Sequence, residues 1–216
     1  MSTRHLLDSE LRALADTTLI PKLTDKNVYK VREQLASKTN LLNDPESHGV
    51  SRTEVFAPQA DGPNVRCLLY QPQVASTSKK AGYLHIHGGG YLFGSPDGSD
   101  LSNILIASKL GIVVLSVDYR LAPENPVPAP LEDCYAGLAY LHSHARTLGV
   151  DKNRIGIGGE SAGGGLAAAL AIKARDIGEY AVCFQALTYP MLNDRTGSEQ
   201  DPGDPLVGEF VWTRQL

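Results

Sequence analysis

The residues that could carry chemistry in this chain begin with Ser161, at the centre of the run Gly-Glu-Ser-Ala-Gly at residues 159–163. This run fits the G-x-S-x-G pattern, in which a serine occupies a sharp turn between a strand and a helix. A side chain on such a turn needs small neighbours, and Gly159 and Gly163 meet that need. The turn lifts the serine hydroxyl above the sheet, where a substrate carbonyl can reach it.

The sequence on both sides of Ser161 favours that turn. Residues 153–158 form a short run that predicts a buried strand, and residues 166–175 are rich in Ala and Leu, which predicts a helix. Glycine and serine are common in loops, so the pentapeptide alone also fits a helix N-cap in a glycine-rich turn. A second motif is needed to decide between the two.

That second motif is His-Gly-Gly-Gly at residues 87–90, directly after an apolar run at residues 83–86 that predicts a strand. Three glycines after a strand leave backbone N–H groups bare and able to approach a ligand closely. In acyl transfer, such donors stabilise the negative oxygen of the tetrahedral intermediate. We expect Gly88 and Gly89 to supply this oxyanion hole, with the N–H of Ala162 as a further donor. The alternative reading of the loop is a flexible turn.

With both motifs in view, the chain resembles the hormone-sensitive-lipase-like (family IV) esterases of the α/β-hydrolase superfamily. The matching pieces, in matching order, are residues 87–90, residues 118–124 (Asp-Tyr-Arg-Leu-Ala-Pro-Glu) and residues 159–164. The resemblance implies an α/β-hydrolase fold, with a mostly parallel sheet, helices on both faces and a helical cap. It also implies hydrolysis of small or medium acyl esters through an acyl-enzyme on Ser161, with no cofactor.

The resemblance further implies supporting roles around the nucleophile. In the family, the residue equivalent to His87 anchors the glycine loop, to which Gly90 also belongs. Gly163 completes the small neighbours of the serine. Glu160 stands where relatives usually carry Asp, a departure that keeps the charge.

The family's catalytic triad runs Ser, then Asp or Glu, then His along the chain, and no histidine follows Ser161 here. All six histidines lie upstream of it: His5, His48, His85, His87, His142 and His144. We therefore expect the triad Asp and His beyond residue 216, so that this chain is the N-terminal part of a larger enzyme. Its C-terminal remainder, in the same or a separate chain, would be its protein partner, and these 216 residues alone would be nearly inactive.

Two other functions stay open at this point. A homologue that keeps the pocket without the base would be a non-catalytic binder of small molecules, although an intact Ser161 and three loop glycines weigh against that. His85 and His87 alternate along one strand and could bind a metal for hydrolysis. A metal site needs a third or fourth ligand, however, and no obvious one follows.

Composition narrows the class of protein. A hydrophobic content of 42% and a charged content of 20% exclude a disordered chain. The net charge of −4 argues against a nucleic-acid partner, and no apolar run is long enough for a membrane span or a secretory signal. The cysteines, which are odd in number and widely spaced, predict reduced, buried side chains in a cytoplasmic protein. They are Cys67, Cys134 and Cys183.

Periodicity predicts the elements that must position the motifs. Residues 52–57 and 65–71 alternate around a turn and predict a hairpin. Residues 112–117 are almost continuously apolar and β-branched, which predicts a central parallel strand. Residues 131–148 predict a helix with one buried face, and residues 182–187 predict a further strand.

Three segments follow from this pattern. Residues 1–45, with helices expected at 9–15 and 25–37, would be the N-terminal cap helices; residues 46–195 would be the hydrolase core; residues 196–216 would start a second cap segment. Asp118 and Arg120 stand at the carboxyl end of the apolar strand, where charged side chains can contact a substrate. We favour the alternative, in which they pair with each other and hold the proline-rich loop that follows.

Overall fold

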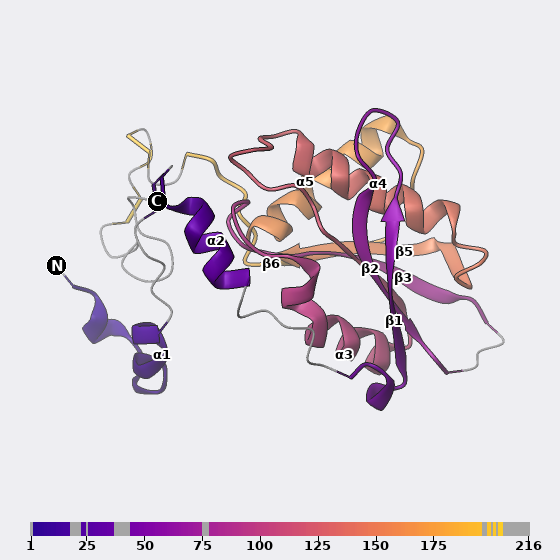
Figure 1. Ribbon diagram of the computed structural model, residues 1–216, viewed down its shortest axis with the longest axis horizontal. Helices are drawn as coiled ribbons and strands as arrows, with labels where there is room; N and C mark the ends of the chain where they lie inside the picture. Colours follow the sequence, from indigo (N-terminus) through magenta and orange to yellow (C-terminus); the bar gives the residue numbers. More distant parts are fainter. Residues whose placement is uncertain are drawn as a thin grey trace. The chain divides into compact units, whose positions relative to one another are not determined.

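The computed structural model describes residues 2–17, 23–24, 26–36, 44–74, 78–195, 198–199, 201 and 203–204. The chain divides into two compact units. One is Leu35–Leu192, and the other combines Met1–Gln34 with Asn193–Leu216. The sheet and both sequence motifs lie in the first unit (Figure 1).

The N-terminal segment is helical where the sequence predicts it. Two 3₁₀ turns are followed by two α-helices: η1 (Arg4–Leu6), η2 (Ser9–Leu11), α1 (Arg12–Thr17) and α2 (Val28–Ala36). The carboxylate of Asp8 caps η2 by accepting a hydrogen bond from the backbone N–H of Glu10 at 2.9 Å. The role of these helices as a cap stays a prediction, and residues 196–216 lie mostly outside the described residues.

The larger unit is built on a six-stranded sheet with the order β1-β2-β4-β3-β5-β6. The strands are β1 (Val50–Ala57), β2 (Val65–Pro72), β3 (Lys80–Ile86), β4 (Val113–Val117), β5 (Val150–Glu160) and β6 (Gln185–Thr188). β1 and β2 pair antiparallel, which confirms the predicted hairpin. β4, β3, β5 and β6 run parallel to one another, so the expected α/β sheet is confirmed, with an antiparallel edge.

Three of the predicted elements differ in detail. β4 is parallel to β3 but antiparallel to β2, because the hairpin brings β2 alongside it in the opposite direction. The predicted helix 131–148 ends earlier, at Ser143, and residues 144–149 form turns that close at Gly149, whose φ is 66°. The predicted strand 182–187 is shorter and later, at Gln185–Thr188.

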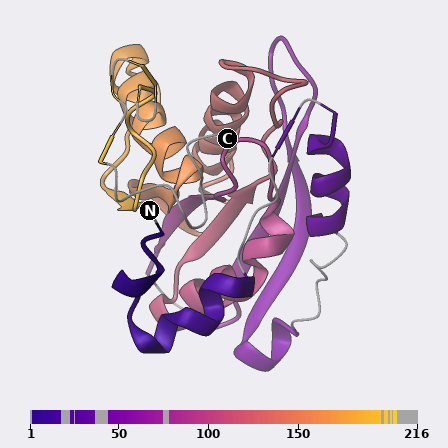
Figure 2. The ribbon, with the colours of Figure 1, turned by 90° about the vertical axis from the view of Figure 1, so that its left-hand side faces the viewer.

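Helices cover both faces of the sheet. α4 (Ala129–Ser143) and α5 (Ala162–Ile177) lie on one face, and α3 (Asp100–Leu110) with the short turn η4 (Pro96–Ser99) lies towards the other. Figure 1 shows α4 and α5 above the strands and α3 below them, and Figure 2 shows the same layers after a 90° turn. Among the described residues, none of the helices combines the length and the apolar character needed to cross a bilayer.

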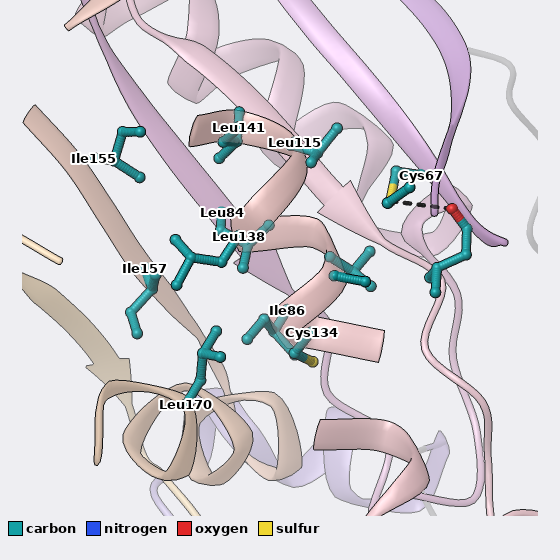
Figure 3. Packing of buried hydrophobic residues seen from close by; sticks show 14 of the residues in the cluster. Cys67, Leu84, Ile86, Leu115, Cys134, Leu138, Leu141, Ile155, Ile157 and Leu170 are labelled. Carbon is teal, nitrogen blue, oxygen red and sulfur yellow. Dashed lines mark hydrogen bonds between the residues drawn. The ribbon is translucent and has the colours of Figure 1, made fainter. Parts of the chain in front are cut away.

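Each face of the sheet has its own apolar cluster. The larger one fills the space between the strands and α4 and α5, as Figure 3 shows, and includes Leu84, Leu115, Ile157, Leu138 and Leu170. The smaller one lies against α3 and includes Tyr70, Val114 and Ile104. Because both faces are covered, the central strands read as nearly continuous apolar runs.

The cysteines follow the prediction in two cases out of three. Cys67 and Cys134 are buried thiols in the larger cluster, and burial raises the pKa of Cys67 to about 12. Cys183 is exposed, so the prediction of a buried side chain is wrong there. It precedes β6, which lies at the end of the strand order and, among the described residues, pairs with β5 alone.

Asp118 and Arg120 do not pair with each other, so that prediction is wrong. Asp118 accepts a hydrogen bond from Arg66 at 3.1 Å, and Arg66 also contacts Asp97 in η4 at 2.7 Å. Arg120 instead forms an ion pair with the fully buried Asp133 of α4 at 2.8 Å. Alternate residues of this extended segment therefore tie the end of β4 to two different neighbours.

Removal of core volume gives a direct test of this packing. Leu115 on β4 is fully buried, so Leu115→Ala should lower the free energy of unfolding by about 2–5 kcal/mol through lost burial and a residual cavity. Leu110→Ala removes the same atoms from a side chain that is 66% exposed. This variant should change the free energy of unfolding by about 0.5 kcal/mol or less. Urea titrations of both variants measure the difference; equal losses would contradict the core assignment.

Candidate active site

The two motifs meet because β3 and β5 are parallel neighbours. His85 pairs with Gly158, and Ile86 pairs with Gly159. Parallel strands present their carboxyl ends at the same edge of a sheet, and ligands bind there in open α/β sheets. The loop that begins at His87 and the turn at Ser161 therefore leave the sheet side by side.

Ser161 lies between β5 and α5 with φ 55° and ψ −116°. A non-glycine residue at positive φ costs of the order of 1–3 kcal/mol and persists only where its surroundings hold it. Here its N–H donates to Thr188 at 3.0 Å, and its carbonyl accepts from Gly165 at 3.0 Å and Met191 at 2.9 Å. The predicted strand, sharp turn and helix around Ser161 are confirmed, and the helix N-cap reading lacks a capping side-chain hydrogen bond.

The small neighbours of Ser161 have a steric cause. A Cβ added to Gly159 would lie 2.1 Å from the carbonyl oxygen of Ile86, and one added to Gly163 would lie 2.0 Å from the same oxygen. Both distances are far inside van der Waals contact. The backbone of the turn thus packs directly on the end of β3, and no larger side chain fits at either position.

The glycine loop folds against this turn. A Cβ on Gly88 would lie 3.0 Å from the carbonyl oxygen of Glu160 and 3.6 Å from Cβ of Ser161. Gly89 has φ 125° and accepts hydrogen bonds from Leu92 and Phe93, and Gly90 has φ 61°. These conformations favour glycine. They make the loop a tight, hydrogen-bonded turn.

Three backbone donors near Ser161 are unused. Among the described residues, the N–H groups of Gly88, Gly89 and Ala162 donate no hydrogen bond to another residue. Gly88 and Gly89 are half-buried, and Ala162 opens α5. Backbone N–H groups at a helix N-terminus and in a glycine loop favour anions or negatively charged oxygens.

His87 anchors the loop from inside. Its ring stacks on Tyr119 with centroids 4.1 Å apart, its Nδ1–H donates to the Gly88 carbonyl at 2.8 Å, and its own carbonyl accepts from the Tyr119 hydroxyl at 3.0 Å. Only 2% of the residue is exposed. Burial lowers the pKa of His87 to about 4, so the ring is neutral at physiological pH.

His85 and His87 do not share a site. The ring nitrogens of His85 lie 3.0 Å from Oγ of Ser116 and 3.2 Å from Oε2 of Glu160, whereas His87 faces Gly88. Across the part of the chain that the structure describes, no three His, Cys, Asp or Glu side chains gather into a metal-binding set. The geometry therefore gives the metal hydrolase reading no support.

Some residues of this site have no signal in the sequence motifs. Tyr119 lies within the motif at residues 118–124, but its stacking on His87 depends on the fold. Thr188 holds Ser161 from β6, and the contact of Glu160 with His85 crosses two strands. Only the parallel pairing of distant segments brings these groups together.

A family model described as alpha/beta hydrolase fold matches residues 83–216. The chain belongs to this family. It is 40% identical over 184 residues to Esterase LipI of Mycobacterium tuberculosis and 36% identical over 187 residues to Carboxylesterase NlhH of the same species. Its fold is similar to that of a solved bacterial heroin esterase, with a TM-score of 0.81 at 40% identity. The resemblance to esterases found in the sequence is thereby confirmed.

The chain spans little more than half of these relatives. The matches cover 85% of this chain but 57% of LipI and 57% of NlhH. The structural match covers 90% of this chain and 61% of the heroin esterase. Family and fold are therefore those of the relatives, whereas the activity of the whole protein is a matter for proposal.

The buried neutral His87 predicts a loss of stability in acid. Its folded pKa of about 4 lies below the ordinary 6.5, so between these pH values the unfolded chain binds a proton that the folded chain does not. The free energy of unfolding should fall as pH falls through this window, by up to about 3 kcal/mol from this group.

Urea titrations at pH 7 and pH 4.5 measure this loss. His87→Asn keeps a donor for the Gly88 carbonyl and removes the titrating ring, so its loss on acidification should be smaller than that of the wild type. His48→Asn, at an exposed histidine, is the matched control. Parallel pH profiles for His87→Asn and the wild type would overturn the assignment.

Proposed function

We propose that this chain is the nucleophile-bearing part of a carboxylic ester hydrolase acting on small or medium acyl esters. The observation that carries the proposal is Ser161, held at positive φ between β5 and α5 beside three unused backbone N–H groups. The names of the relatives, which are esterases and carboxylesterases, support the same reaction class. The free thiols of Cys67, Cys134 and Cys183 support a cytoplasmic location as part of this proposal.

The reaction would proceed through an acyl-enzyme. The hydroxyl of Ser161 attacks the ester carbonyl while a base takes its proton, and the carbonyl oxygen becomes negative in the tetrahedral intermediate. Collapse of that intermediate releases the alcohol and leaves the acyl group on Ser161. Water then attacks the acyl-enzyme, and the carboxylic acid leaves with the serine hydroxyl restored.

The oxyanion would be stabilised by the N–H groups of Gly88, Gly89 and Ala162. They are backbone dipoles fixed in place before the reaction, so little reorganisation is needed when charge develops. Removal of one such donor typically costs about 10²–10³ in kcat. His87 would support this oxyanion hole indirectly, because the hydrogen bond from its ring to the Gly88 carbonyl fixes the conformation of the glycine loop.

The base and its acid would come from the part of the relatives' length that this chain does not span. Among the described residues, no histidine ring forms a hydrogen bond with the Ser161 hydroxyl. β6 offers a place for a further segment, because only β5 pairs with it within the described residues. Large apolar side chains are exposed at or near β6: Phe184, Tyr189, Met191 and Leu192. An unpaired strand edge beside exposed apolar groups favours the docking of another strand.

The nucleophile assignment has a direct test. In a preparation that hydrolyses p-nitrophenyl butyrate, Ser161→Ala should lower kcat by about 10⁴-fold or more, because no acyl-enzyme can form. A serine-directed phosphonate should label the wild type at Ser161 and leave the variant unlabelled. Ser143→Ala, at an exposed serine at the end of α4, controls for the substitution. Activity above a few per cent in Ser161→Ala would rule the assignment out.

The need for a remainder predicts complementation. These 216 residues alone should turn over the same ester only faintly, since a serine hydroxyl without a base is a weak nucleophile at neutral pH. Addition of a polypeptide that supplies the missing part of the relatives' length should restore turnover, and Ser161→Ala should abolish that gain. Ordinary enzymatic rates from a chain shown by mass spectrometry to end at Leu216 would contradict the proposal.

A further inference from the structure

One buried polar contact links the two strands that carry the site. His85 on β3 is 1% exposed, and its Nε2 lies 3.3 Å from Oε1 and 3.2 Å from Oε2 of Glu160 on β5. His85 pairs with Gly158 in the ladder, so the contact runs diagonally towards the carboxyl ends of both strands. Glu160 is half-buried and directly precedes Ser161.

The partners of His85 define which ring nitrogen carries the proton. Its Nδ1 lies 3.3 Å from the amide nitrogen of Asn103, which can only donate, and 3.0 Å from the hydroxyl of Ser116, which can also donate. Nδ1 is therefore the acceptor, and Nε2–H points at the carboxylate of Glu160. Both neighbours are fully buried, so the imidazole is held in one orientation.

Glu160 is ionised in this setting. Burial raises the pKa of its carboxyl group, but the hydrogen bond from His85, together with a backbone hydrogen bond, outweighs burial, and the pKa lies below its ordinary value. A hydrogen bond to an ionised acceptor is stronger than one between neutral groups. The contact is thus a firm link between a rigid ring and the last residue of β5.

The contact between His85 and Glu160 lies next to both Ser161 and the glycine loop. His85 stands two residues before the loop of Gly88, and Glu160 stands one residue before Ser161. Gly88 also packs on the carbonyl group of Glu160. A shift of Glu160 would therefore move the serine hydroxyl relative to the loop donors.

We propose that His85 and Glu160 are positioning residues, which form a cross-strand brace that keeps the Ser161 hydroxyl aligned with the N–H groups of the glycine loop. The inference rests on the proposed function, in which these groups act together on the oxyanion. Alignment of the nucleophile with the donors matters most in the transition state, because negative charge develops on the carbonyl oxygen there and is absent from the bound substrate. Loss of the brace lowers kcat and leaves KM nearly unchanged.

The size of the effect follows from geometry. A displacement of about 1 Å in a catalytic group can cost about 10²-fold in rate. We expect Glu160→Met, which keeps the length of the side chain and removes its oxygens, to lower kcat about ten-fold or more, with KM within about two-fold. His85→Phe keeps a flat ring and removes the Nε2–H donor, so it should lower kcat to the same extent as Glu160→Met. Glu160→Gln keeps an oxygen that accepts from His85 and should retain most of kcat.

A double variant tests whether His85 and Glu160 affect kcat through their shared contact or independently of each other. If the two side chains act through one contact, His85→Phe combined with Glu160→Met should have a kcat no lower than the worse single variant. His142→Phe is the matched control for His85→Phe, since it removes a buried imidazole of α4 that hydrogen-bonds the carbonyl group of Ala181 at 3.0 Å. It should lower the melting temperature and leave kcat unchanged.

Amide hydrogen exchange provides a readout that needs no turnover. In the 216-residue chain, Glu160→Met and His85→Phe should speed exchange in a peptide covering residues 86–94, and His142→Phe should not. If the 216-residue chain shows this exchange pattern but the wild type completed with the missing part of the relatives' length lacks esterase activity, the proposed function fails and the brace stands. The brace is overturned if exchange is unchanged, or if an active wild type and both variants share the same kcat. It is also overturned if Glu160→Gln behaves like Glu160→Met, because charge rather than the hydrogen bond would then be responsible.

Discussion

The whole site depends on one close backbone contact, between the carbonyl group of Ile86 at the end of β3 and the turn that follows β5. At Gly159 and Gly163, a Cβ would lie about 2 Å from that oxygen. The two strands can approach this closely only because glycine lacks a side chain. Other features of the site lie beside this approach: the positive φ of Ser161, the neighbouring Gly88, and the backbone N–H groups that donate no hydrogen bond within the described residues.

Because of this contact, backbone atoms set the geometry of the site. The surrounding side chains hold that backbone in place. His87 locks the glycine loop by stacking on Tyr119, and Thr188 holds the N–H of Ser161. Arg66 joins η4, which follows the loop, to the end of β4 through Asp97 and Asp118. In the proposed reaction, such supporting contacts would matter because donors aimed at an oxyanion are effective only when they do not reorganise during the reaction.

Local patterns predicted the elements well and the long-range pairings poorly. The hairpin of β1 and β2, the turn at Ser161 and α5 each follow from neighbouring residues, and all are present. The pairing of Asp118 with Arg120 and the burial of Cys183 were wrong, since each depends on segments far away in sequence. Helix and strand periodicity indicates which face of an element is apolar, but it does not identify the charged side chain of another element that will pair with a given residue.

The sequence by itself determined which reactive motifs the protein has: a serine in a glycine turn, three glycines after a strand, and the order in which these occur. Backbone geometry of this kind depends on the residues within the turn, so it can be recognised locally. Only the tertiary structure decided which groups share the site, because β3 and β5 are separated in the chain by α3, β4 and α4. The His85–Glu160 contact belongs to that second class, since a hydrogen bond exists only where folding brings donor and acceptor within about 3 Å.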